Sequence, residues 1–292
     1  MATEKKQPIL PTKVKWMQRF FSVAGNIAPV TAIHILVKLM FSPQKRVLRP
    51  PHKELLKKAQ KHVLKVSEFR QAKKKLKLKY YSWGKGEKTV LLAHGWDAMA
   101  MDFYKMIPAL TDEGYRVIAF DGPAHGGSEG SASNLLHFKE VMLDIIEKEG
   151  NPYAIIGHSM GGGASCYLLM EHTIKVKRLV LMAIPISSKR FFDGVFTMLK
   201  VPQKMQRLFF KGMEEEFNYS IDRMNLATRT EKIKAEKAML VYDEFDEVVS
   251  LPDIKDFLKA RPEVKPVNIK GAGHNHIIRN KKAIEEIIGF LN

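Results

Sequence analysis

Residues 154–165 read AIIGHSMGGGAS, and this short stretch decides the fold. An apolar run ends at Gly157, and a helix-like run begins after Ser159. The spacing Gly157-x-Ser159-x-Gly161 is typical of a nucleophile elbow, a sharp strand-to-helix turn that exposes a serine hydroxyl. Glycines on either side remove side chains that would collide in so tight a turn. The alternative, a serine that only caps a helix, is disfavoured by the strand that precedes it.

Similar apolar runs recur along the chain, and each ends in a polar or glycine-rich turn. They read TVLLAH (89–94), RVIAFD (116–121), YAIIGH (153–158), RLVLMA (178–183), AMLVYD (238–243) and, more weakly, PVNIKG (266–271), while LKLKYYSW (76–83) alternates like a half-exposed strand. Continuous apolar runs separated by helical patterns predict a mainly parallel sheet covered by helices on both faces. In such sheets the ligand site lies beyond the carboxyl ends of the strands.

A serine hydroxyl is a weak nucleophile until a base takes its proton, and the base is normally a histidine. His274 ends the segment GAGH after the last strand-like run, which places it in a flexible loop at the expected end of the sheet. His276 lies two residues further on and is the main alternative. We expect His274 to be the base of Ser159.

The histidine in turn needs a carboxylate to orient it. The segment VYDEFDEVVS (241–250) offers acidic residues directly after a strand. Asp246 is favoured because it sits in the loop proper, just before two apolar valines. The order Ser159, Asp246, His274 is the order expected for this architecture.

The reaction also needs N–H donors for the oxyanion that develops on the carbonyl. The backbone N–H of Met160, directly after the serine, is one candidate. Trp96, in the turn HGWD that follows TVLLAH, supplies the other. His94 is expected to order this turn rather than to transfer protons. For Asp97 and Asp102, substrate contact and helix capping remain open alternatives.

With these residues placed, the chain resembles the α/β-hydrolase superfamily, and within it the serine-aminopeptidase-like and lysophospholipase-like hydrolases. The likeness covers residues 77–292 and rests on HGW (94–96), DGPAHGGS (121–128), GHSMGG (157–162) and GAGH (271–274), with FDEVV (245–249) as a looser fifth segment. The resemblance implies hydrolysis of carboxylic esters or related acyl groups through an acyl-serine intermediate, with no cofactor and no metal. It also implies that Asp121 is a structural turn residue.

The acidic loop departs from the pattern H-G-x-x-D that is common in relatives. Here Tyr242 and Asp243 occupy the first two positions. Asp243 is therefore a competitor of Asp246 for the role of the triad acid.

Charge is distributed unevenly along the 292 residues, whose net charge is +17. Residues 1–79 hold 20 Lys and Arg against 3 Asp and Glu, whereas the rest of the chain is balanced. We expect solvated basic helix faces, with peripheral membrane contact through this N-terminal part as the alternative and no nucleic-acid partner. The single cysteine, Cys166, allows no internal disulfide, which fits a reducing compartment and predicts a cytoplasmic location.

The domain organisation is predicted in three parts. Residues 1–76 form a basic helical extension that packs on the core: an unstructured start over 1–12, helices from Lys13 and Pro29, and a third helical stretch over 52–72. Residues 77–185 and 233–292 form the α/β-hydrolase core. Residues 186–232 are rich in Phe and Met and form a helical lid.

The leading functional hypothesis is a serine hydrolase that acts on small-molecule esters with an apolar acyl or alkyl group. A peptidase or amidase on the same triad is the first alternative, and the acidic residues 214–216 could then hold a substrate amine. A binding protein that keeps the fold without catalysis is the second.

Overall fold

The computed structural model describes residues 12–68, 71–217, 225–226 and 229–292. The chain divides into two compact units. The larger unit comprises residues 41–187 and 225–292, and the smaller one lies within residues 1–40 and 188–224. The prediction made for residues 1–12 falls outside the described residues, except for Thr12, with which the first helix begins.

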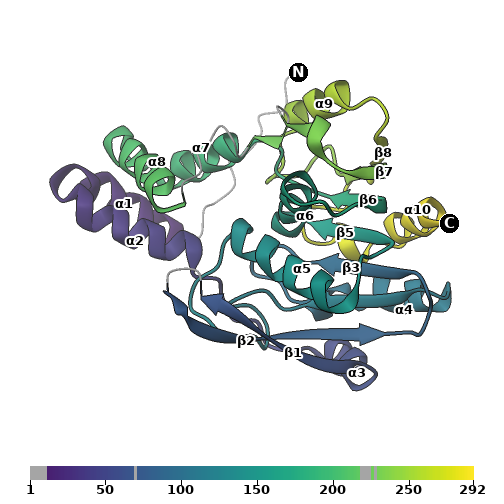
Figure 1. Ribbon diagram of the computed structural model, residues 1–292. Helices are drawn as coiled ribbons and strands as arrows, with labels where there is room; N and C mark the ends of the chain where they lie inside the picture. The colour runs from purple at the N-terminus through teal and green to yellow at the C-terminus, as the bar shows by residue number, and fades with distance from the viewer. Residues whose placement is uncertain (1–11, 69–70, 218–224, 227–228) are drawn as a thin grey trace. The chain divides into compact units, whose positions relative to one another are not determined.

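An eight-stranded sheet forms the centre of the larger unit (Figure 1), with the strand order β1-β2-β4-β3-β5-β6-β7-β8. The strands are β1 (Gln60–Glu68), β2 (Gln71–Trp83), β3 (Thr89–Ala93), β4 (Arg116–Phe120), β5 (Ala154–His158), β6 (Val176–Met182), β7 (Ala235–Tyr242) and β8 (Lys265–Asn268). From β4 to β8 neighbouring strands are parallel, whereas β2 runs antiparallel to both β1 and β4. The predicted mainly parallel sheet is thereby confirmed.

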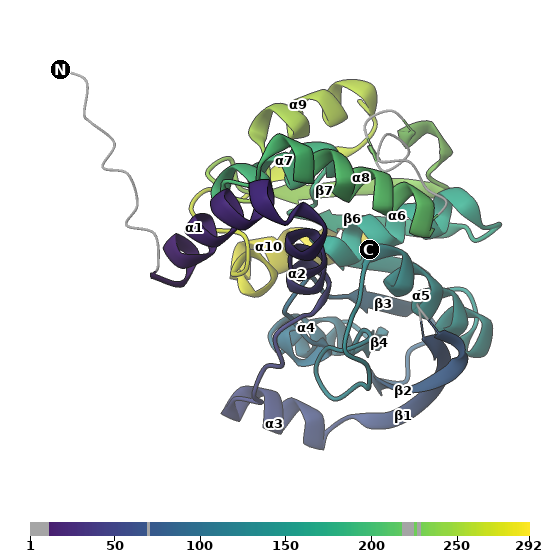
Figure 2. The same cartoon turned by 90° about the vertical axis from the view of Figure 1, so that its left-hand side faces the viewer.

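Helices cover both faces of this sheet, as predicted (Figures 1 and 2). Helices α5 and α6 pack together on one face, and α4 and α10 lie on the other. The helices of this unit are α3 (Pro50–Lys57), α4 (Met106–Asp112), α5 (Leu135–Glu149), α6 (Met160–Glu171), α9 (Leu251–Ala260) and α10 (Lys281–Leu291), with short 3-10 turns η1 (Ala100–Phe103), η4 (Thr230–Lys232) and η5 (Ile277–Arg279). The central strands are buried on both faces, which explains why their sequences are continuously apolar.

The helical stretch predicted for residues 52–72 is wrong. Only α3 is helical there, and β1 follows from Gln60 as an edge strand paired with β2. Its side chains alternate: His62, Leu64 and Val66 are less exposed than their neighbours on either side. Val63 is apolar yet exposed, and this residue hides the two-residue period from a reading of the sequence.

The smaller unit consists, in its described part, of α1 (Thr12–Ile27), α2 (Pro29–Phe41) up to residue 40, α7 (Ser188–Leu199) and α8 (Gln203–Phe217). The helices expected from Lys13 and Pro29 are thus present. Phe192, Phe196 and Phe209 form an aromatic cluster between α7 and α8, with ring centroids 5.2–6.3 Å apart. The lid role predicted for residues 186–232 concerns how the two units meet, and it stays a prediction. Within the described residues, no helix is long and apolar enough to cross a membrane.

Candidate active site

The predicted site residues follow the carboxyl ends of neighbouring strands of the larger unit. Ser159 comes directly after β5, and His94 comes directly after β3. The acidic segment follows β7, and His274 lies in the loop after β8. Because β3, β5, β6, β7 and β8 are parallel, these loops emerge at one edge of the sheet.

Ser159 adopts a backbone conformation that few non-glycine residues take, with φ 50° and ψ −120°. Its N–H donates to the carbonyl of Met182 on β6 over 2.9 Å, which helps to hold the turn in place. A Cβ on Gly161 would collide with the carbonyl oxygens of Ala93 and His94, and one on Gly157 would collide with the backbone of α6. The tight approach expected at both glycines is present.

The three residues predicted as a triad lie in a row of contacts. Nε2 of His274 is 3.0 Å from Oγ of Ser159. Nδ1 of the same ring is 2.8 Å from Oδ2 of Asp246. The Asp246 side chain is 1% exposed and the His274 side chain 13%, so this row is mostly shielded from water. The structure brings His274 to Ser159, whereas His276 is exposed.

Asp243 and Asp246 have different surroundings. Asp246 Oδ1 accepts the N–H groups of Val248 and Val249, which aims its other oxygen at the imidazole. Asp243 is occupied by backbone: it accepts N–H groups from Phe245, Gly271 and Gly273.

Burial of Asp243 opposes its ionisation, but these N–H donors prevail and hold the pKa of this carboxyl below its usual value. Asp243 thus fixes the loop that carries His274, and Asp246 contacts the ring itself.

His158 is a supporting residue that the sequence reasoning overlooked. Its Nε2–H donates to the carbonyl of His274 over 2.9 Å, so this side chain braces the backbone of the predicted base. Burial, reinforced by the nearby His274, lowers the pKa of His158 to about 3. Its Nδ1 is buried with no hydrogen-bond partner in the described structure, which the neutral form tolerates better than the charged one. The only signal in the sequence is its place inside the elbow motif.

The two predicted oxyanion donors follow strands β5 and β3. Met160 is the first residue of α6, and N–H groups in the first turn of a helix have no carbonyl of that helix to bond. Trp96 lies in the turn after β3. Among the described residues, the backbone N–H of Trp96 donates to no backbone or side-chain acceptor. Both groups are thus available to a ligand.

His94 links the loops after β3 and β4. Its Nδ1–H donates to the carbonyl of Gly95 over 2.7 Å, and its Nε2 accepts the N–H of Gly122 over 3.0 Å. Burial lowers the pKa of His94 well below its usual value, so the ring is neutral. Through these contacts the His94 side chain holds the two loops together.

Asp121 is buried beside the same loops. One carboxylate oxygen accepts the N–H of Ala100, and the other accepts the Tyr81 hydroxyl and the N–H of Gly127. Burial raises its pKa despite these donors. Asp121 therefore ties a turn to the loop after β3.

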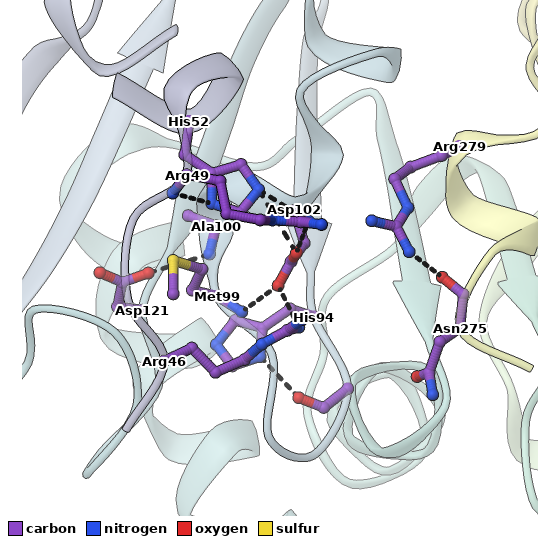
Figure 3. Close-up of polar contacts among 11 residues, drawn as sticks. Arg46, Arg49, His52, His94, Met99, Ala100, Asp102, Asp121, Asn275 and Arg279 are labelled. Atoms are coloured by element: carbon purple, nitrogen blue, oxygen red, sulfur yellow. Dashed lines mark hydrogen bonds and ion pairs between the residues drawn. The ribbon is translucent and has the colours of Figure 1, made fainter. Parts of the chain in front are cut away.

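Asp102 is the centre of a second polar network (Figure 3), which the sequence did not reveal. The carboxylate is 2% exposed and accepts the N–H of Met99 over 3.0 Å. Arg46 approaches it at 3.0 Å and Arg49 at 3.5 Å, both from the segment that follows α2. Asp97 is engaged in the same way, since its Oδ1 accepts the N–H of Gln44 over 2.7 Å. Both aspartates therefore join the loop after β3 to upstream chain, in place of the substrate contact left open above.

Within the described residues, no group of three or more His, Cys, Asp or Glu side chains is arranged to hold a metal ion.

Parts of the chain are similar to known proteins. A family model described as alpha/beta hydrolase fold matches residues 88–221. A putative esterase/lipase of Mycoplasma genitalium is 26% identical over 122 residues, which make up 38% of this chain and 46% of that protein. The chain spans less than half the length of the first curated relatives it matches.

Solved structures extend the likeness over more of the chain. An esterase from Pyrococcus furiosus superposes with a TM-score of 0.63 at 19% identity, over 86% of this chain and 98% of that one. A membrane phospholipase A, described as a bacterial virulence factor, gives a TM-score of 0.61 at 18% identity over 96% and 97%. Strand order, elbow and family match agree, and the chain has the α/β-hydrolase fold.

Proposed function

We propose that this protein is a serine hydrolase that cleaves carboxylic esters through an acyl-serine intermediate. The observation that carries the proposal is the row of contacts from Ser159 Oγ through the His274 ring to Asp246, at 3.0 and 2.8 Å. A hydroxyl, an imidazole and a carboxylate in this order are the parts needed to activate a serine.

In the first step His274 Nε2 takes the Ser159 proton while Oγ attacks the ester carbonyl carbon. Asp246 accepts the Nδ1–H of the ring, which fixes the tautomer and stabilises the imidazolium that forms. The strained elbow presents the hydroxyl at the end of β5, and the brace from His158 keeps the loop of the base in register.

The tetrahedral intermediate carries its negative charge on the former carbonyl oxygen. The N–H groups of Met160 and Trp96 are the donors we assign to it. Collapse of the intermediate breaks the bond to the alcohol, which takes the proton from His274 and leaves an acyl-serine. Water then attacks the acyl carbon and gives a proton to His274. The bond from that carbon to Ser159 Oγ breaks, Oγ takes the proton back from His274, and the carboxylic acid leaves.

The proposed substrates are esters with an apolar acyl or alkyl part. The curated relatives include proteins named putative esterase/lipase and pyrethroid hydrolase, which supports hydrolysis of apolar esters.

The test is hydrolysis of p-nitrophenyl esters of increasing chain length by the full chain. Ser159→Ala should lower kcat/KM by at least about 10³-fold. Ser165→Ala is the matched control: this serine, on α6, donates within its own helix to the carbonyl of Gly161, and its loss should leave turnover within a few-fold. Unchanged hydrolysis by Ser159→Ala would sink the proposal.

A fluorophosphonate probe separates the enzyme from a non-catalytic binding protein of the same fold. Labelling of Ser159 in the folded wild-type chain supports catalysis, and no labelling supports the binding protein. Nitroanilides of the same acyl groups separate an esterase from an amidase, since faster release from the amides than from the esters would favour the latter.

A further inference from the structure

Helix α1 carries a stripe of large apolar side chains that face water. Trp16, Phe20, Val23 and Ile27 are 66, 41, 59 and 80% exposed. They are spaced by four, three and four residues, so at about 100° per residue they lie within an arc of about 60° on one face of the helix. We call these four residues the α1 stripe.

The α1 stripe is not what holds this helix in the smaller unit. The opposite face does so: Phe21 and Gly25 are buried, and Gly25 lies so close to Pro202 and Met205 that a Cβ there would collide with both. The side chain of Gln18 also donates to the carbonyl of Met198 over 2.6 Å. Because α1 packs in the smaller unit through its opposite face, the α1 stripe is accessible to a binding partner.

Exposed apolar surface is concentrated in this unit. Of the 14 large apolar side chains that are exposed among the described residues, ten lie in its four helices. Besides the α1 stripe these are Val30, Ile35, Leu39, Phe191, Met198 and Leu208. A continuous row of exposed apolar side chains such as the α1 stripe marks an interaction surface rather than ordinary scatter.

The charges beside the stripe have one sign. Residues 5–53 contain ten Lys and Arg and no Asp or Glu. At the same helical spacing, Lys13 and Arg19 flank the α1 stripe, one on each side. Long basic side chains in this position extend toward phosphate groups while their stems stay with the apolar face.

We propose that α1 lies on the surface of an anionic lipid bilayer, with the α1 stripe at the boundary between head groups and acyl chains. A one-sided apolar stripe flanked only by cations fits a surface of uniform negative charge. A protein partner that bound this face through specific ion pairs would require acidic residues beside the stripe as well as basic ones. The proposal does not depend on the hydrolase activity.

The test is co-sedimentation of the full chain with vesicles of phosphatidylcholine, either alone or with about one third phosphatidylglycerol. We expect strong pelleting with the anionic vesicles, little with the neutral ones, and a decline as salt is raised. Trp16 should report the contact by a blue shift of its emission, which Trp16→Phe removes while binding persists.

The variant Phe20→Ser/Ile27→Ser should weaken partition into anionic vesicles by about tenfold or more, because two apolar side chains leave the interface. The matched control is Val47→Ser/Val63→Ser, which changes two exposed valines of the larger unit and should partition like wild type. Thermal unfolding of all variants checks that each is folded.

Three outcomes would overturn the proposal. The first is no pelleting of the wild type, and the second is equal pelleting of the wild type and the Phe20→Ser/Ile27→Ser variant. The third is a wild-type dimer, without vesicle binding, that this variant converts into a monomer, because the stripe would then meet a second copy of the chain.

Discussion

Nη1 of Arg46 donates to Oδ2 of Asp102 over 3.0 Å, and this pair joins the segment after α2 to the loop after β3. Gln44 strengthens the junction, because its N–H donates to Asp97, the residue directly after the motif HGW (94–96). Gln44 and Arg46 lie outside residues 88–221, the range that the family model matches. The loop that carries Trp96 is therefore supported by chain that the family pattern does not describe.

Asp102→Ala should cost about 2–4 kcal/mol of unfolding free energy, because Arg46, Arg49 and the N–H of Met99 lose a buried partner. Arg46→Ala should cost less than about 1 kcal/mol, since Arg46 is 41% exposed and its ion pair is screened by water. Urea unfolding gives both numbers. Equal losses for the two variants would contradict the central position of Asp102.

Asp246→Asn and Asp243→Asn should separate catalysis from stability. In Asp246→Asn, kcat should fall by about 10³-fold with little change in thermal stability, because the remaining amide oxygen can still accept the N–H groups of Val248 and Val249. Asp243→Asn should instead destabilise the fold by about 1–3 kcal/mol, since an amide cannot accept three N–H groups as a carboxylate does. Ester kinetics and thermal melts, run on both variants, check this. A larger loss of kcat in Asp243→Asn, measured on fully folded protein, would reverse the assignment.

Gly161→Ala should abolish stable folding or cost more than about 2 kcal/mol, because its Cβ would meet the carbonyls of Ala93 and His94. Gly289→Ala is the matched control: this glycine is in α10 and a Cβ there would meet nothing within 4 Å. The control should stabilise the protein by about 0.5–1 kcal/mol, as alanine favours helix. Expression level and urea unfolding provide the readouts. A Gly161→Ala protein as stable as wild type would show that the turn at Ser159 can accommodate a Cβ at this position.

The protein should lose stability as the pH falls from 7 to 5.5. Burial lowers the pKa of His158 to about 3 and that of His125 to about 4, and it lowers the pKa of His94 as well. Below 6.5 the unfolded chain therefore binds protons that the folded chain does not, and the free energy of unfolding falls with pH. Each such histidine contributes about 1.4 kcal/mol per pH unit once the pH is well below 6.5.

Urea unfolding at several pH values measures this slope, and His125→Gln should reduce it by the share of one histidine. A slope that is the same in the variant and the wild type would mean that His125 is protonated in the folded state.

Sequence reasoning found the sheet because most of its strands are parallel and buried on both faces, which makes their sequences apolar without interruption. It selected Ser159 because this residue follows such a strand, and His274 because the segment GAGH follows the last, weaker strand-like run, which forms the edge strand β8. It left Asp243 and Asp246 open, since both follow β7 and only three-dimensional contacts show which carboxylate meets the imidazole.

Elsewhere the sequence had less to offer. The edge strand β1 looked helical because pairing with β2, rather than local pattern, decides its conformation. The Arg46–Asp102 junction joins residues 56 positions apart, and a basic residue in a chain segment rich in lysine carries no sign of its partner. His158 stands inside the elbow motif. The sequence does not reveal its hydrogen bond to the His274 backbone, because that bond depends on the loop after β8.

The smaller unit is assembled from two distant stretches of chain, and this has a consequence for synthesis on the ribosome. Helices α1 and α2 emerge about 150 residues before α7, which at ordinary elongation rates is a delay of roughly ten to thirty seconds. During that interval the face of α1 that carries Phe21 and Gly25, which ends up buried, has no α7 or α8 to cover it. The nascent chain therefore presents α1, with apolar side chains on both of its faces, to chaperones and lipid surfaces before the strand-to-helix turn at Ser159 has been synthesised.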